Sequence, residues 1–169
     1  YTVTVTVLFG IRKVWHLSIC SLISDCCRHK GVFIDMSTLN LTLLTDLYEL
    51  TMMQGYYESN SSETVIFDAF YRKNPCDNGY AISAGLDQVI DYINNLHFSE
   101  EDISYLASLG IFHEGFLDYL RNFHFEGDIW AIPEGSVVFP YEPLLKVIAP
   151  IMQAQLVETA ILNIINHQS

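Results

Sequence analysis

Apolar residues recur at helical spacing over Leu43–Tyr57 and predict a helix there. Asp46 and Glu49 fall in its first turns, where the helix dipole favours negative charge, and Thr42 or Thr45 can cap it. The apolar side chains fall into two rows, with Leu44, Tyr48, Met52 and Tyr56 in one and Leu43, Leu47 and Leu50 in the other. A helix with two apolar faces is expected to contact two partners.

The pattern changes to that of strands after a polar loop at residues 58–63. TVIFDAFYR, residues 64–72, is rich in β-branched and aromatic residues and predicts a strand. Its alternation puts Val65, Phe67, Ala69 and Tyr71 on one side and Ile66, Asp68, Phe70 and Arg72 on the other. The turn cluster NPCDNG, residues 74–79, separates it from a second expected strand, YAISAG, residues 80–85.

Helical spacing returns over Leu86–Leu96, and Ser99 with Asp102 resembles a capping box that opens a helix ending near Gly110. Residues 116–123 continue the helical pattern. Three short apolar runs, 128–132, 136–139 and 144–148, are separated by prolines and predict a small β-layer. Pro150 suits the first position of a last helix, Ile151–Asn166, which is apolar on most faces and is therefore expected to be buried.

Charge divides the 169-residue chain at Met36. Residues 1–35 carry four basic and two acidic side chains, whereas 18 acidic and four basic residues follow, a net charge of −14. Three of the four cysteines also precede Met36. We interpret residues 1–35 as an upstream-translated, non-native extension. A targeting segment is the weaker alternative, and a real extra strand in YTVTVTV, residues 1–7, is another.

The acidic part of the chain lacks the basic patches that nucleic acids and anionic membrane surfaces require. One cysteine after Met36 gives no disulfide framework, which fits a reducing, cytoplasmic location. The sequence has no metal-ligand spacing, and GxGxxG, P-loop, GxSxG and HExxH motifs are missing. The residues alone therefore predict one acidic α+β domain.

Five blocks of the chain resemble nicotinate phosphoribosyltransferase in order and spacing. They are LLTDLYELTMMQGYY, VIFDAFYRKNP, GYAISAGLDQVIDYI, AIPEGSVVFPYEPLLKV and QLVETAILNIINHQS. The resemblance covers nearly all of residues 40–169 and none of residues 1–35. It implies the amino-terminal α+β domain of a type II phosphoribosyltransferase over residues 36–147. Residues 148–169 would then begin an irregular α/β barrel that is mostly absent from this chain.

The resemblance also implies an activity, that of a glycosyltransferase-type enzyme of pyridine nucleotide salvage and NAD biosynthesis. It joins nicotinate to 5-phosphoribosyl 1-pyrophosphate, giving nicotinate mononucleotide and pyrophosphate. Mg²⁺ and coupled hydrolysis of ATP, a ligase-like feature, belong to the intact enzyme, which is expected to be a homodimer. The phosphorylated histidine that couples ATP lies on a downstream barrel segment. The 169-residue chain is therefore expected to hold no catalytic residue, to bind no cofactor and to be inactive alone.

Four substrate-binding residues follow from the resemblance. Tyr48 is expected to contact the nicotinate ring, across a dimer interface, because a flat pyridine stacks well on an aromatic side chain. Arg72 and Lys73 are expected to reach the phosphoribosyl pyrophosphate, because Arg binds phosphate in a bidentate manner and basic residues are scarce here. Asp46 is a further candidate, although its place at a helix start explains it equally well.

Glu158 is interpreted as a buried, hydrogen-bonded packing anchor, since it is a lone carboxylate in an apolar helix. Two alternatives to the enzyme remain open. One is a non-catalytic dimerisation or interaction fragment that regulates a full-length partner. The other is a phosphoribosyltransferase that uses nicotinamide or quinolinate, because specificity lies largely in the missing barrel.

Overall fold

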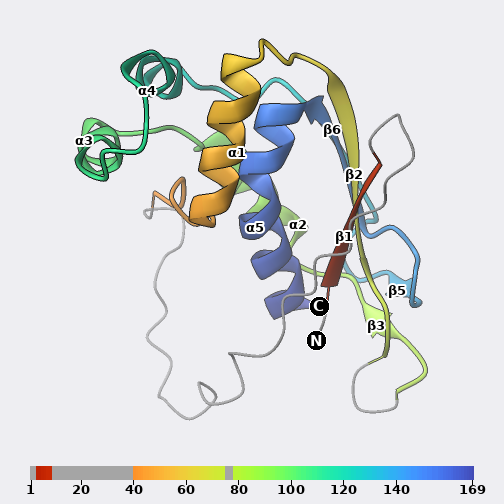
Figure 1. Cartoon of the computed structure of the whole chain (residues 1–169). Coiled ribbons are helices and arrows are strands. Elements are labelled where there is room, and N and C mark those ends of the chain that lie inside the picture. Colours follow the sequence, from red (N-terminus) through yellow and green to blue (C-terminus); the bar gives the residue numbers. More distant parts are fainter. Residues whose placement is uncertain (1–2, 9–39, 75–77) are drawn as a thin grey trace.

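The computed structural model describes residues 3–8, 40–74 and 78–169 and has two layers, a sheet and the helices on one of its faces (Figure 1). The four-stranded sheet has the order β1-β2-β6-β4, and every neighbouring pair is antiparallel. Its strands are β1 (Val3–Leu8), β2 (Thr64–Tyr71), β6 (Leu145–Pro150) and β4 (Asp128–Ala131). A second, two-stranded sheet pairs β3 (Ala81–Ile82) with β5 (Val137–Val138). The mixed α+β architecture is confirmed.

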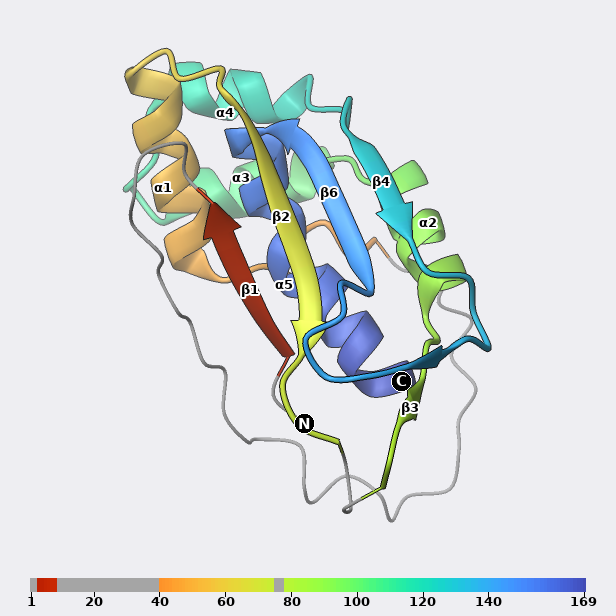
Figure 2. The ribbon, with the colours of Figure 1, turned by 90° about the vertical axis from the view of Figure 1, so that its right-hand side faces the viewer.

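Strands β2 and β6 form the centre of the fold, as Figure 2 shows. In β2 the residues with odd numbers from Val65 to Tyr71 are buried, which confirms the predicted alternation. They face the same side as the buried residues of β6, and the register sets Phe67 opposite Val147. Because strand side chains alternate between faces, one apolar stripe on each strand is enough to form the sheet's half of the core.

The three short strands predicted at residues 128–148 are confirmed, but they do not form one layer together. Strands β4 and β6 join β2 in the main sheet, and only β5 leaves it to pair with β3. The second expected strand is also much shorter, since only Ala81 and Ile82 of residues 80–85 are extended and paired. Short apolar runs give a strand's existence but not its partner, which depends on long-range packing.

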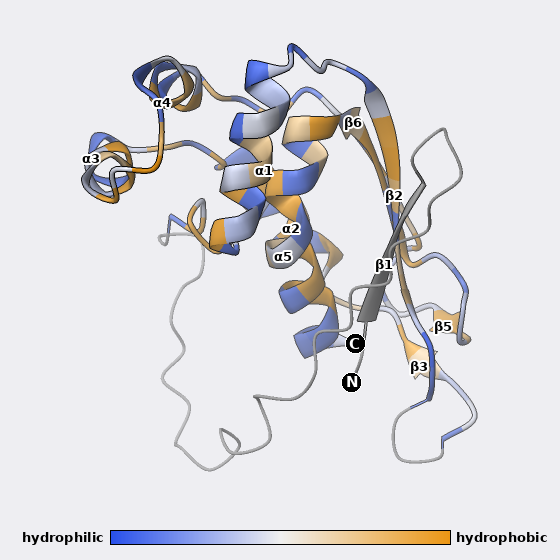
Figure 3. Cartoon of the chain, viewed as in Figure 1, coloured by the Kyte–Doolittle hydropathy of each residue, from blue (hydrophilic) through white to orange (hydrophobic). Residues whose placement is uncertain are grey.

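Helix α5 (Ile151–Gln168) is the core of the helical layer. Thirteen of its 18 residues are buried, because it packs against the sheet, α1 and α2 (Figure 3). The expected burial is confirmed, but Pro150 is the N-cap rather than the first helical residue, and it also closes β6. Among the described residues no barrel is closed, so α5 as the start of a barrel stays a prediction.

Helix α1 (Leu47–Glu58) begins four residues later than the apolar spacing predicts. Its N-cap is Asp46, not Thr42 or Thr45, and Asp46 forms a capping box with Glu49. The Glu49 carboxylate accepts a hydrogen bond from the backbone N–H of Asp46 at 3.2 Å. The apolar spacing continues into residues 43–46, but the capping box satisfies the free N–H groups at the helix end and sets the start at Leu47.

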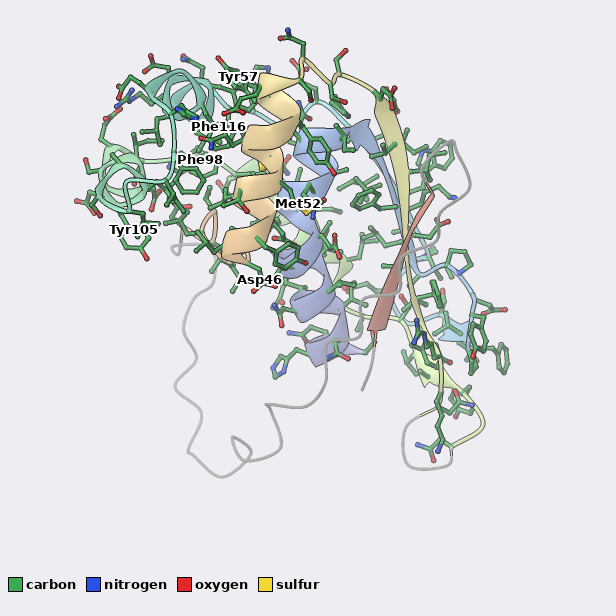
Figure 4. All side chains as sticks on the ribbon, in the orientation of Figure 1. Asp46, Met52, Tyr57, Phe98, Tyr105 and Phe116 are labelled. Atoms are coloured by element: carbon green, nitrogen blue, oxygen red, sulfur yellow. The ribbon has the colours of Figure 1, made fainter. Side chains whose placement is uncertain are left out.

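The remaining helices are α2 (Leu86–Asn94), α3 (Glu100–Ser108) and α4 (Glu114–Arg121). The predicted capping box of α3 is confirmed, because Ser99 Oγ accepts from the backbone N–H of Asp102 at 3.2 Å. Helix α4 is a separate element, attached to α1 by an aromatic cluster (Figure 4). In this cluster the ring centroids of Tyr57 and Phe116 lie 5.9 Å apart.

Met36 and most of the proposed extension, residues 1–35, lie outside the described residues. The exception is β1, which pairs in full with β2, so that Val3 lies opposite Tyr71 and Leu8 opposite Ile66. The alternating pattern at the start of the chain thus does form a strand. The origin of residues 1–35 and the boundary at Met36 stay predictions.

Candidate functional site

Tyr48 lies in the first turn of α1 and is partly exposed, with 37% of its surface accessible. Leu44, Leu47 and Met52 are also exposed, at 37%, 52% and 41%. Met52 lies one helical turn after Tyr48, Leu47 is its neighbour in the chain, and Leu44 lies just before the helix. Together these four side chains form an apolar face, which we call the α1 face. Four exposed apolar side chains within nine residues at the start of α1 make this surface a candidate contact surface.

The Tyr48 phenol stands in a negative environment. Partial burial raises its pKa most, followed by the charges of Glu158, Glu49 and Asp46. The phenol therefore stays neutral over the whole physiological range. A neutral ring suits stacking against a flat ligand, including one that carries a negative charge.

Asp46 joins this group through α5. Its carboxylate lies 3.5 Å from the hydroxyl of Thr159, and its charge acts on both Tyr48 and Glu158. The prediction that Asp46 serves as a charge at the helix start is confirmed by its N-cap position. Its side chain nevertheless faces the same helix junction as Tyr48, which helix geometry alone did not suggest.

Glu49 was not singled out by the sequence as a site residue, yet it is fully buried. Its carboxylate accepts hydrogen bonds from Thr45 Oγ1, from the Asp46 N–H and, at 2.8 Å, from Thr159 Oγ1. Burial raises its pKa, and these hydrogen bonds act against that rise. The partner that buries Glu49 comes from α5, 110 residues later, so no local pattern could have revealed it.

Glu158 of α5 is buried, with 7% of its surface exposed, which confirms the expected buried carboxylate. Glu158 is the lone carboxylate of α5, as expected, but Glu49 and Asp46 from the start of α1 are its electrostatic neighbours. Its one hydrogen-bond partner among the described residues is Gln155, at 3.4 Å. Burial, together with the charges of Glu49 and Asp46, raises the pKa of Glu158 to about 7.

Arg72 and Lys73 follow directly after the end of β2 at Tyr71. Arg72 is half-buried and Lys73 is exposed. They therefore belong to the sheet layer, whereas Tyr48 belongs to the helical layer (Figure 1). The described part of the chain does not assemble the basic pair, Asp46 and Tyr48 into one pocket, and their shared role stays a prediction.

Two further findings concern metal binding and membrane-spanning helices. Within residues 3–8, 40–74 and 78–169, no group of three or more His, Cys, Asp or Glu side chains is placed to hold a metal ion. No helix of the same residues is long and apolar enough to cross a bilayer.

Comparison with known proteins connects this fold to one family. Residues 43–166 match the family described as the nicotinate phosphoribosyltransferase N-terminal domain. A nicotinate phosphoribosyltransferase of Mycobacterium tuberculosis is 48% identical over 127 residues, which are 75% of this chain and 27% of that protein. The nicotinate phosphoribosyltransferase of Bacillus subtilis is 44% identical over 131 residues, 77% of this chain and 27% of its own length.

The fold is also similar to that of a solved structure from this family. The crystal structure of human nicotinic acid phosphoribosyltransferase superposes with a TM-score of 0.66 at 33% sequence identity, covering 72% of this chain and 25% of the human chain. The chain thus spans about a quarter of the length of the relatives that it matches. With the family match extending over residues 43–166, the chain belongs to the nicotinate phosphoribosyltransferase family and carries its amino-terminal domain.

Proposed function

We propose that this chain is the amino-terminal part of an enzyme of NAD salvage that joins nicotinate to 5-phosphoribosyl 1-pyrophosphate. The carrying observation is the family match over residues 43–166, supported by the similarity of the fold to the human enzyme. The pyridine nitrogen attacks ribose C1, the bond from C1 to the pyrophosphate oxygen breaks, and nicotinate mononucleotide and pyrophosphate result. The enzyme must hold the ring in line and stabilise the departing polyanion.

Tyr48 is the residue that we assign to the nicotinate ring. Its exposure on the α1 face and its neutral phenol support this role, because stacking needs an accessible and uncharged ring. The α1 face of one subunit would meet the next subunit of a homodimer, which places Tyr48 at that interface. Arg72 and Lys73 are proposed to serve the phosphoribosyl pyrophosphate, and Asp46 to hold the start of α1. A fully active monomeric enzyme would contradict the shared site.

Mg²⁺ and ATP are proposed for the intact enzyme only. The described residues offer no group of three or more His, Cys, Asp or Glu side chains placed to hold a metal ion. The 169-residue chain is proposed to be inactive alone and cytoplasmic. A purified chain that made nicotinate mononucleotide from both substrates would contradict the first of these proposals, and fluorescence microscopy of a tagged chain in cells tests the second.

Substitution of Tyr48 in the full-length enzyme that contains this domain tests the ring contact. Tyr48→Ala should raise KM for nicotinate by roughly fivefold, since stacking on an aromatic side chain contributes about 1 kcal/mol. Tyr48→Phe should be mild because the ring is kept. Steady-state kinetics with nicotinate as the varied substrate measures both.

Tyr105→Ala is the matched control, because Tyr105 is also exposed, at 57%, but lies on α3. Its KM for nicotinate should not change. If Tyr48→Ala lowered only the melting temperature and left KM unchanged, Tyr48 would be a packing residue and the proposed contact would be wrong.

A further inference from the structure

Three carboxylates from two helices lie within electrostatic range of one another where the start of α1 packs against α5. Asp46 and Glu49 come from the start of α1, and Glu158 comes from the middle of α5. Thr159 links the helices, since its hydroxyl lies 2.8 Å from Glu49 Oε1 and 3.5 Å from Asp46 Oδ2. Glu49 is fully buried and Glu158 is 7% exposed, so water cannot screen their mutual repulsion well. We call Glu49 and Glu158 the acid pair.

Among the described residues, no ion pair brings a cation to the acid pair. Lys146 pairs with Asp68 at 2.8 Å on the open face of the sheet, and Arg121 pairs with acidic residues of α3 and α4. The described residues also provide no cluster that could hold a metal ion. Two unpaired buried carboxylates cost several kcal/mol, and a proton on one of them removes most of this cost.

The elements packed around the acid pair add no positive charge. Helix α2 contributes Tyr92, which is 5% exposed and whose hydroxyl has no hydrogen-bond partner. Helix α1 contributes Tyr48 beside Asp46. The buried faces of β2 and β6 are apolar except for Tyr71, which hydrogen-bonds to the backbone of Val138, and β1 has no ionisable residue in its sequence. His167 lies on α5 but is exposed near its end.

Hydrogen bonding decides which member of the acid pair carries the charge. Glu49 accepts three hydrogen bonds, which stabilise an anion. Among the described residues Glu158 has only Gln155 as a hydrogen-bond partner, at 3.4 Å. It lines a cavity of about 10 Å³ whose other walls are apolar residues such as Phe67, Val147 and Leu162. An apolar cavity favours the neutral acid over the carboxylate.

We propose that the acid pair is a proton-dependent latch between α1 and α5, in which Glu49 is the anion and Glu158 takes up and releases a proton near neutral pH. The proton removes the repulsion between the pair and keeps the start of α1, and with it Tyr48, in place on α5. Loss of the proton puts a second negative charge next to Glu49, Asp46 and Tyr48. Glu158 thereby acts as a positioning residue for the α1 face. The latch concerns this chain alone and does not require that Tyr48 binds nicotinate.

Carboxyl-carbon NMR of the 169-residue chain, labelled with ¹³C-glutamate and titrated between pH 4 and pH 9, tests the latch. We expect the Glu158 resonance to titrate with a midpoint near pH 7 instead of at the ordinary 4.5, in line with the pKa that burial gives it. The Tyr48 ring signals should shift with the same midpoint. Through-bond assignment identifies both groups in the unmodified chain, so no variant has to fold for the test to work.

Two variants then separate a latch from a merely structural carboxyl. In Glu158→Gln the Tyr48 shift near pH 7 should disappear, because no proton can leave the amide. In Glu101→Gln, which changes an exposed carboxyl on α3, it should stay. A Glu158 midpoint near 4.5, or Tyr48 signals that do not move through the Glu158 midpoint, would overturn the proposal. Both outcomes are independent of any measurement of nicotinate binding.

Discussion

At the scale of single residues, Glu49 shows how one side chain can satisfy local and long-range demands together. Its carboxylate accepts from the Asp46 N–H at the start of α1, which fixes where the helix begins. The same carboxylate accepts from Thr159 of α5, which fixes how the two helices meet. A helix-end charge, as the sequence suggests it, would lie in solvent. The Glu49 carboxylate is instead fully buried, so the hydrogen bonds that it accepts affect the free energy of unfolding.

Thr159→Val tests the hydrogen bond that joins α1 to α5. Valine keeps the shape of threonine but removes the hydroxyl that lies 2.8 Å from Glu49 Oε1. The free energy of unfolding should fall by about 1–3 kcal/mol, because a buried carboxylate loses one of its donors. Thr51→Val is the matched control, since the Thr51 hydroxyl bonds to a backbone carbonyl on the exposed side of α1. Denaturant titration should show a change there within about 0.5 kcal/mol.

At the scale of elements, the sequence predicts the features that neighbouring residues determine, but not those that depend on contacts between distant residues. The β2 strand and the capping box of α3 were predictable, because alternation and the Ser99–Asp102 spacing act over a few residues. The start of α1 was misplaced, because apolar spacing continues through residues that the cap excludes from the helix. The partners of β4, β5 and β6 could not be read, since the pairing of β6 with β2 joins residues about 80 positions apart.

The close approach of the loop before β4 to β6 gives a prediction at this scale. A Cβ added to Gly127 would lie 2.5 Å from the Ala149 Cβ and 2.8 Å from the backbone oxygen of Ile148. Gly127→Ala should therefore lower the free energy of unfolding by about 1–3 kcal/mol, because the backbone of β6 must move.

Gly55 provides the opposite case in α1. A Cβ there meets nothing within 4 Å, and the residue lies inside a helix. Gly55→Ala should raise the free energy of unfolding by roughly 0.5–1 kcal/mol, because alanine favours the helix. Thermal unfolding of the two variants in parallel should show shifts of opposite sign. Equal shifts in melting temperature would mean that the close contacts around Gly127 do not destabilise the Gly127→Ala variant.

At the scale of the whole molecule, the sequence predicts the family and part of the site, but the arrangement of charges depends on packing. Tyr48 was assigned to the site from its block of sequence, and that role stays a prediction for a side chain that the structure leaves partly exposed. The acid pair was not predictable as a pair, because Glu49 and Glu158 are brought together only when α5 packs on α1. The stability of the entire domain should consequently depend on pH through this one junction.

The direction of that dependence follows from the pKa of Glu158, which rises from 4.5 to about 7 on folding. Between these values the folded state binds more protons than the unfolded state, so the free energy of unfolding falls as pH rises. Below pH 4.5 the group costs nothing, and above pH 7 it costs about 3 kcal/mol, since one pKa unit corresponds to roughly 1.4 kcal/mol. Urea unfolding at intervals from pH 4.5 to pH 8 measures this fall.

Glu158→Gln is the comparison that isolates the effect, because the amide fills the same space and cannot titrate. The pKa of His124 is also raised, by its backbone hydrogen bond to Asn122 and its pairing with Glu126, and this contributes a fall of the same sign in both proteins. The informative quantity is therefore the difference between the two curves. The free energy of unfolding of the unmodified chain minus that of Glu158→Gln should be smallest at high pH. This difference should be constant below pH 4.5 and above pH 7. Parallel curves would show that Glu158 is charged throughout and that the junction tolerates two buried carboxylates.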